Sequence, residues 1–117
     1  MARLSRLLRS AAENHIAFWC PGCDEAHMVK VGPGGWGFDG NVESPTFTPS
    51  VKCTTQYGDG RGTHICHSFV TAGRIDFCGD STHALAGRSA ELSLWPVGYW
   101  DGDSVIEEPD GEQRNLE

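Results

Sequence analysis

Long hydrophobic runs are missing from this sequence. No stretch approaches the roughly 18 consecutive apolar residues that a membrane-spanning helix requires. The only early apolar cluster is interrupted by Arg3, Arg6 and Arg9, and it does not have the pattern of a secretory leader. We therefore expect a soluble, cytoplasmic protein that does not bind membranes.

Basic residues are also few. Nine Lys and Arg stand against 16 Asp and Glu, so the formal net charge is −7 at pH 7. A surface of this charge repels a phosphate backbone. We therefore expect no direct binding to nucleic acid.

Familiar catalytic motifs are lacking as well. The sequence has no G-x-S-x-G elbow, Walker loop, H-E-x-x-H helix or deaminase signature. Asp76 and Asp80 are expected to be solvated acids at a strand edge and a turn. The sequence leaves enzymatic activity open, favours a protein without it, and assigns no catalytic residue.

What is present indicates one small, mainly β (small α+β) domain. The chain has 117 residues, with 15 glycines and six prolines that separate short apolar runs. Residues 1–14 are expected to form an amphipathic N-terminal helix over Arg3–Ala12, because Leu4, Leu7 and Leu8 recur at helical spacing. Residues 15–100 should form a zinc-binding β-rich domain, and residues 101–117 a flexible acidic tail.

The clearest hairpin joins the strand-like runs 65–70 and 74–78 through a loop of three residues, Thr71 to Gly73. If Ile75 and Phe77 face the core, this loop places Ile65, His67 and Phe69 on the buried side and Cys66 on the outer side. After the hairpin, Ser81 or Thr82 is expected to cap one helical turn that ends at Gly87.

Five cysteines predict a metal site rather than a disulfide framework, because an odd number leaves one thiol unpaired. In Cys20-Pro21-Gly22-Cys23, the two-residue gap lets both sulfurs point at one ion, which is the spacing of a zinc knuckle. Zn²⁺ is the expected cofactor. The predicted ligands are Cys20, Cys23, His67 and His83, with Cys66 as the alternative to His67.

The number of ligands decides what such a zinc site can do. Four protein ligands close the site, so that the ion stabilises the fold. Three ligands leave a position for a water molecule, and hydrolysis becomes possible. The sequence leaves both arrangements open.

The order of the motifs resembles a family of small proteins encoded by tailed phages and prophages, some of which carry an ammonia-monooxygenase-like label. The motifs are Phe18-Trp19-Cys20-Pro21-Gly22-Cys23, Ser44-Pro45-Thr46-Phe47-Thr48-Pro49-Ser50, Cys66-His67-Ser68-Phe69 and Thr82-His83-Ala84-Leu85-Ala86-Gly87. The resemblance implies a phage origin, a bacterial host cell and a zinc site. It implies no activity.

These observations predict a zinc-stabilised accessory protein of a phage that acts by binding a host or phage protein. Two alternatives are a zinc-dependent hydrolase of a small substrate and an acidic, phosphate-mimicking inhibitor of a host nucleic-acid or defence complex. The sequence does not identify the partner or the oligomeric state.

Overall fold

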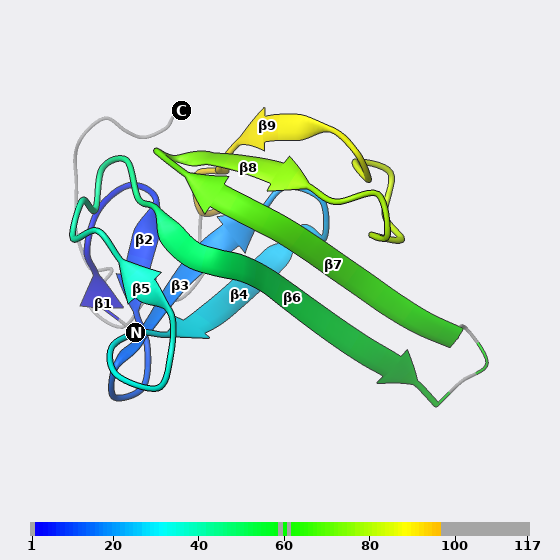
Figure 1. Ribbon diagram of the computed structural model, residues 1–117, viewed down its shortest axis with the longest axis horizontal. Coiled ribbons are helices and arrows are strands. Elements are labelled where there is room, and N and C mark those ends of the chain that lie inside the picture. Colours follow the sequence, from blue (N-terminus) through cyan, green and yellow to red (C-terminus); the bar gives the residue numbers. More distant parts are fainter. Residues whose placement is uncertain (1, 59, 61, 97–117) are drawn as a thin grey trace.

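The computed structural model describes residues 2–58, 60 and 62–96, so the expected acidic tail lies outside the described residues. Within these ranges the chain forms nine β-strands in two antiparallel sheets and no α-helix (Figure 1). The prediction of a mainly β domain is therefore confirmed. No helix in the described ranges is long and apolar enough to cross a membrane.

The first sheet has four strands in the order β1-β2-β3-β4. These are β1 (Ala2–Arg3), β2 (Leu8–Ser10), β3 (His15–Cys20) and β4 (Glu25–Lys30). The second sheet has five strands in the order β5-β6-β7-β8-β9. These are β5 (Gly37–Phe38), β6 (Phe47–Tyr57), β7 (Gly62–Thr71), β8 (Arg74–Phe77) and β9 (Ser89–Glu91).

The core lies between the two sheets. Phe18 of β3 stacks on Phe47 of β6 with ring centroids 6.0 Å apart, and Val70 and Ile75 of the second sheet are fully buried beside them. Figure 1 shows β6 and β7 crossing in front of β3 and β4. Alternate residues of the facing strands supply this core, which is how two packed antiparallel sheets bury apolar side chains.

Strand β3 is buried on both faces. Its outer face is covered by Trp95, whose ring lies 5.4 Å from that of Trp19 and whose Nε1 donates a hydrogen bond to the Leu7 carbonyl (2.9 Å). The end of the described chain is therefore part of the packing of the first sheet.

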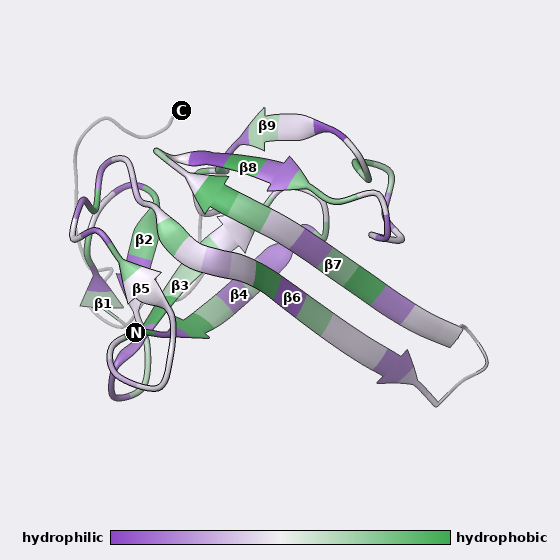
Figure 2. Cartoon of the chain, viewed as in Figure 1, coloured by the Kyte–Doolittle hydropathy of each residue, from purple (hydrophilic) through white to green (hydrophobic). Residues whose placement is uncertain are grey.

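Strands β6 and β7 form a hairpin that extends beyond the core (Figure 1). Figure 2 shows mainly hydrophilic colours over its far end, and the side chains of Thr54, Thr55 and Gln56 are exposed there. Ser50, Cys66 and His67 lie in the half of the hairpin that is nearer to the core.

The expected N-terminal helix is not formed, and residues 2–10 are two short strands joined by a turn. Leu7 and Leu8 are both buried, and Leu8 pairs with Phe18. Ser5 Oγ accepts the N–H groups of both leucines and holds the turn. Arg9 is also buried: its guanidinium group donates to the carbonyls of Ser5 and Leu8 and lies 4.8 Å above the Trp95 ring.

The strands of the β7–β8 hairpin are confirmed, but the predicted faces of β7 are wrong. The turn has two residues rather than three: Ala72 and Gly73 have φ of 50° and 77°, and Thr71 pairs with Arg74. Positive φ at both central residues is the pattern of a type I′ turn. Since a shift of one residue reverses every side chain, Cys66 faces inward and His67 and Phe69 face outward.

The expected helical turn after Thr82 is also absent, and residues 84–87 form turns that do not continue into a helix. The hydroxyl groups of Ser81 and Thr82 do not cap a helix. They accept hydrogen bonds from the backbone N–H groups of His67 (3.0 Å) and Ile65 (3.0 Å) on β7. The segment after β8 is therefore fastened along β7.

Candidate active site and metal centre

Four sulfur and nitrogen donors meet on the inner side of β7. The donor atoms of Cys20, Cys23, Cys66 and His83 all lie within 4.8 Å of one another, so this cluster could hold a metal ion. Cys20 ends β3, Cys23 follows in the turn to β4, Cys66 lies on β7, and His83 lies in the segment after β8. The cluster thus joins three parts of the chain that are distant in sequence.

The sulfur separation fits one tetrahedral ion. Cys20 Sγ lies 3.7 Å from Cys66 Sγ, which is far too long for a disulfide bond, and all five cysteines are free. Two thiolates at about 2.3 Å from a tetrahedral zinc ion are separated by about 3.8 Å. The Cys23 N–H points at Cys20 Sγ from 3.4 Å, as expected for a knuckle turn.

Gly22 makes room for the histidine donor. A Cβ atom at this position would lie 2.3 Å from His83 Cε1 and 2.6 Å from Nε2, so the imidazole ring can rest on the turn only because Gly22 has no side chain. His83 Nε2 is buried and has no hydrogen-bond partner among the described residues. An unpartnered buried nitrogen beside three thiols fits a metal ligand.

The charge states also suit a cation. Hydrogen bonds from Cys23 and Cys66 lower the pKa of the Cys20 thiol, because they stabilise its thiolate. The pKa of Cys66 is raised because it donates to Cys20 and stands beside the negative sulfur. Burial lowers the pKa of His83, which keeps its imidazole neutral and able to donate a lone pair. A divalent ion bound here would compensate the charge of the Cys20 thiolate and favour loss of the proton from Cys66.

Of the five residues predicted as ligands, the structure gathers Cys20, Cys23, Cys66 and His83 and leaves His67 outside. His67 faces the other side of the sheet because the hairpin register differs from the predicted one. Among the other cysteines and histidines, His64 contacts Cys23 (3.1 Å), and His27 contacts Cys53 (3.5 Å). They flank the cluster.

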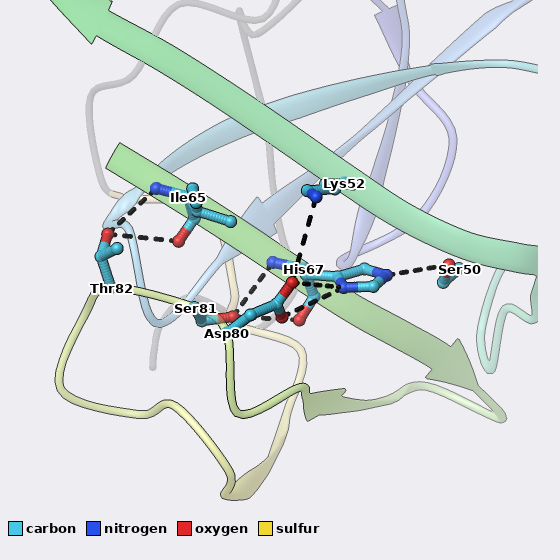
Figure 3. A network of polar contacts seen from close by, with 7 residues as sticks. All are labelled: Ser50, Lys52, Ile65, His67, Asp80, Ser81 and Thr82. Atoms are coloured by element: carbon cyan, nitrogen blue, oxygen red, sulfur yellow. Dashed lines mark hydrogen bonds and ion pairs between the residues drawn. The ribbon is translucent and has the colours of Figure 1, made fainter. Parts of the chain in front are cut away.

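A second constellation lies on the outer side of β7, where His67 stands between Ser50 and Asp80 (Figure 3). His67 Nε2 lies 3.1 Å from Ser50 Oγ. His67 Nδ1 lies 3.1 Å and 3.2 Å from the two carboxylate oxygens of Asp80. A hydroxyl, an imidazole and a carboxylate in this order form the arrangement that activates a serine as a nucleophile.

A β-bulge presents the serine. Phe47 pairs with Val70 and Val51 pairs with Ser68, so the three residues 48–50 of β6 lie opposite Phe69 alone. Bulges of this kind redirect side chains at functional sites. The Ser50 carbonyl accepts a hydrogen bond from Trp36 Nε1 (3.0 Å), which fixes the backbone of the bulge.

The segment after β8 presents the carboxylate. Cys78 N–H donates to the His67 carbonyl (2.8 Å), and Ser81 Oγ accepts from the His67 N–H, so Asp80 is held between two backbone attachments. Lys52, the residue paired with His67 on β6, brings its ammonium to 4.0 Å from Asp80. Phe69 is half exposed on the same face, with its ring 6.4 Å from that of His67.

Sequence reasoning missed Ser50 and Asp80. Ser50 has no glycine-flanked motif around it, and Asp80 was expected to be a solvated acid, whereas its carboxylate is hydrogen-bonded to His67. The only local signal was a serine after the proline pair of residues 45–49. The pairing of distant strands, which no spacing rule gives, assembles the constellation.

The two clusters share their supports. Cys66 and His67 are consecutive residues of β7, and Asp80 and His83 lie three residues apart in one segment. An ion held by Cys66 and His83 would therefore fasten the same two chain segments that carry His67 and Asp80.

Comparison with known proteins gives one match. No curated protein and no solved structure matches the chain. A family model described as the bacterial ubiquitination-like system serine protease, BubE, matches residues 3–78, which include Ser50 and His67 and end just before Asp80.

This match overturns the expected function. A phage accessory protein that acts only by binding is wrong, because the family description names a serine protease, and neither the zinc hydrolase nor the phosphate mimic agrees with that description. The phage origin implied by the motif resemblance stays a prediction. The match covers more than half of the 117 residues, and the chain belongs to the BubE family of bacterial ubiquitination-like system serine proteases.

Proposed function

We propose that this chain is a serine protease whose catalytic residues are Ser50, His67 and Asp80. The observation that carries the proposal is the position of His67, which has Ser50 Oγ at one ring nitrogen and the Asp80 carboxylate at the other. The family description supports the same reaction class. Each distance is within the range for a hydrogen bond between catalytic groups.

In the first step, Ser50 Oγ attacks the carbonyl carbon of the scissile bond and transfers its proton to His67 Nε2. The resulting imidazolium gives this proton to the leaving amine, and an ester remains on Ser50. Water then attacks the ester, His67 accepts its proton, and the proton returns to Ser50 Oγ as the carboxylic acid product leaves. No external oxidant or reductant is required.

Asp80 orients the base. Its carboxylate accepts the Nδ1–H of His67, which keeps the lone pair on Nε2 toward Ser50, and it stabilises the imidazolium that forms during the reaction. Lys52 places its ammonium group 4.0 Å from the Asp80 carboxylate.

We propose zinc as the ion of the metal centre, held by Cys20, Cys23, Cys66 and His83. Three sulfur donors and one imidazole form a common structural zinc set, and four protein ligands leave no position for a reacting water. Zinc bound here would cross-link the Cys20–Cys23 turn, strand β7 and the segment after β8. Ser50, His67 and Asp80 carry out all the chemistry.

The family description suggests that the substrate is a protein of a bacterial ubiquitination-like system, and we propose such a protein as the partner. Free thiols fit the reducing bacterial cytoplasm as the site of action. The acidic chain is not proposed to bind nucleic acid.

A fluorophosphonate probe tests the nucleophile directly. Wild-type protein should become labelled at Ser50, and Ser50→Ala should abolish both labelling and peptide-bond cleavage. Ser44→Ala is the matched control, since Ser44 is also half-buried and also stands beside a proline. Labelling that persists in Ser50→Ala would refute the assignment.

A further inference from the structure

A second cysteine-containing group includes two of the proposed catalytic residues. The donor atoms of His67, Cys78 and Asp80 all lie within 4.8 Å of one another. Cys78 follows Phe77, which faces the core, so alternation turns its side chain to the outer face, where His67 lies. The thiol has no place in the reaction described above.

We propose that these three residues form an inhibitory site for a second zinc ion, distinct from the structural centre on the opposite side of β7. This inference rests on the proposed protease function. Nitrogen, sulfur and carboxylate oxygen are all donors that zinc accepts, and three protein ligands with one open position form a common zinc arrangement.

The site is accessible from solvent. The side chains of His67 and Asp80 are 25% and 49% exposed, and Cys78 is partly exposed, whereas Cys20 and Cys66 of the structural centre are buried. An ion can therefore enter and leave without opening the core. Only three donors hold it, so it should bind more weakly than the ion of the four-donor cluster.

Inhibition follows from the tautomer of His67. Catalysis needs the proton on Nδ1 and a lone pair on Nε2. A zinc ion on Nδ1 replaces that proton, which moves to Nε2, while the Cys78 thiol loses its own proton to solvent when its sulfur binds the metal. Nε2–H can then only donate toward Ser50 Oγ, and it cannot accept the serine proton. Asp80 binds the ion instead of orienting the imidazole.

The rate of peptide-bond cleavage should be measured over a range of chelator-buffered Zn²⁺, with protein that already holds one equivalent of zinc. The rate of each variant is expressed relative to its own rate without added zinc. Wild type should be inhibited, and Cys78→Ala should raise the half-inhibitory concentration about tenfold or more, since even changes around metal ligands cost that much affinity. Cys53→Ala, which removes a thiol that is not one of the three donors, should behave as wild type. Equal sensitivity of wild type and Cys78→Ala, or equal loss in Cys53→Ala, would overturn the proposal.

A binding measurement separates this site from the protease function. Equilibrium dialysis of Ser50→Ala, followed by metal analysis, should give two zinc ions per chain, and Ser50→Ala/Cys78→Ala should give one. Ser50→Ala/Asp80→Asn serves as a second variant if the first does not fold, and it should also lose the weaker ion. If wild type has no hydrolase activity but binds the second ion through Cys78, the protease function falls and the metal site stands as a binding site. One ion per chain in Ser50→Ala would refute the site.

Discussion

At the scale of single residues, His67 commits each ring nitrogen to a different partner. Ser50 lies at Nε2 and Asp80 at Nδ1, and the backbone of His67 is held by Ser81 through both its N–H and its carbonyl. A base fixed in this way is preorganised for one direction of proton transfer. Small changes in its partners should therefore have large kinetic effects.

Asp80→Asn should reduce kcat by roughly 10³- to 10⁴-fold, as expected when an amide stabilises the wrong imidazole tautomer. The fold and the ion of the four-donor cluster should be retained, because Asp80 is half exposed and lies outside that cluster. Steady-state kinetics with a peptide substrate and metal analysis provide the two readouts. A fall of less than tenfold would remove Asp80 from the catalytic residues.

Lys52→Met serves as the control for Asp80→Asn, because it removes a charge close to Asp80 and leaves the carboxylate in place. The Lys52–Asp80 contact is 4.0 Å long and both side chains are about half exposed, so solvent screens it. Exposed pairs contribute at most about 1 kcal/mol, and we expect kcat to fall less than about fivefold.

Gly22→Ala should weaken zinc binding although it leaves every ligand in place. The added methyl group would overlap the His83 ring at 2.3 Å and displace that donor. Competition with a chromophoric chelator should show an affinity loss of about tenfold or more. Gly58→Ala is the control, because nothing lies within 4 Å of a Cβ at that position. Equal affinities of the two variants would contradict the role of Gly22.

At the scale of elements, the β7–β8 turn decides which side chains serve which face. Ala72 adopts φ of 50°, a region that costs a non-glycine residue about 1 kcal/mol. Ala72→Asn should raise the free energy of unfolding by up to about 1 kcal/mol, because asparagine followed by glycine is favoured in this turn type. Thermal unfolding should show a Tm higher by a few degrees. An unchanged or lower Tm would count against a strained turn.

The length of this turn also limits what the sequence can predict, because it sets which residues of β7 face the core. The two strand-like runs of the β7–β8 hairpin follow from alternation and turn residues, and the structure forms both as strands. The pairing of Cys20 and Cys23 follows from their spacing, whereas His83, which the structure places beside them, has no such local pattern. The choice of Cys66 or His67 depended on one residue of loop length, which composition does not determine.

Other features could not be predicted because they depend on contacts between distant segments. The leucines near the N-terminus have helical spacing, but Leu8 gains more from pairing with β3 and packing in the core. Ser50 meets His67 only through the register of β6 and β7, and Asp80 meets it only through the attachments of Ser81 and Thr82. No local motif encodes these encounters.

At the scale of the whole molecule, the four-donor cluster and the proposed catalytic residues lie on opposite sides of one sheet and depend on the same chain segments. Chelation of the zinc should lower stability by several kcal/mol, because binding energy at such a centre is folding energy. Activity should fall with it, since β7 and the Asp80 segment lose their common attachment.

Cadmium replacement distinguishes this structural role from catalysis by metal. Protein refolded with one equivalent of Cd²⁺, enough for the four-donor cluster alone, should regain the native circular dichroism spectrum and the kcat of protein that holds one equivalent of zinc, because the ion of this cluster takes no part in proton transfer. Removal of the ion without loss of thermal stability would show that the four donors do not cross-link the fold. A kcat that follows the identity of the metal would overturn the assignment of Ser50 as nucleophile.

Cys66 and His67 are neighbours in the chain, yet their side chains serve opposite faces of the sheet. A deletion or insertion of a single residue between His67 and the β7–β8 turn would change the register of this pair relative to β8 and exchange their orientations, so that both the proposed metal centre and the proposed catalytic residues would be lost. Point changes at exposed positions of this strand should be tolerated during evolution, whereas length changes should be eliminated. The spacing of β7, more than its composition, is the feature that selection must preserve.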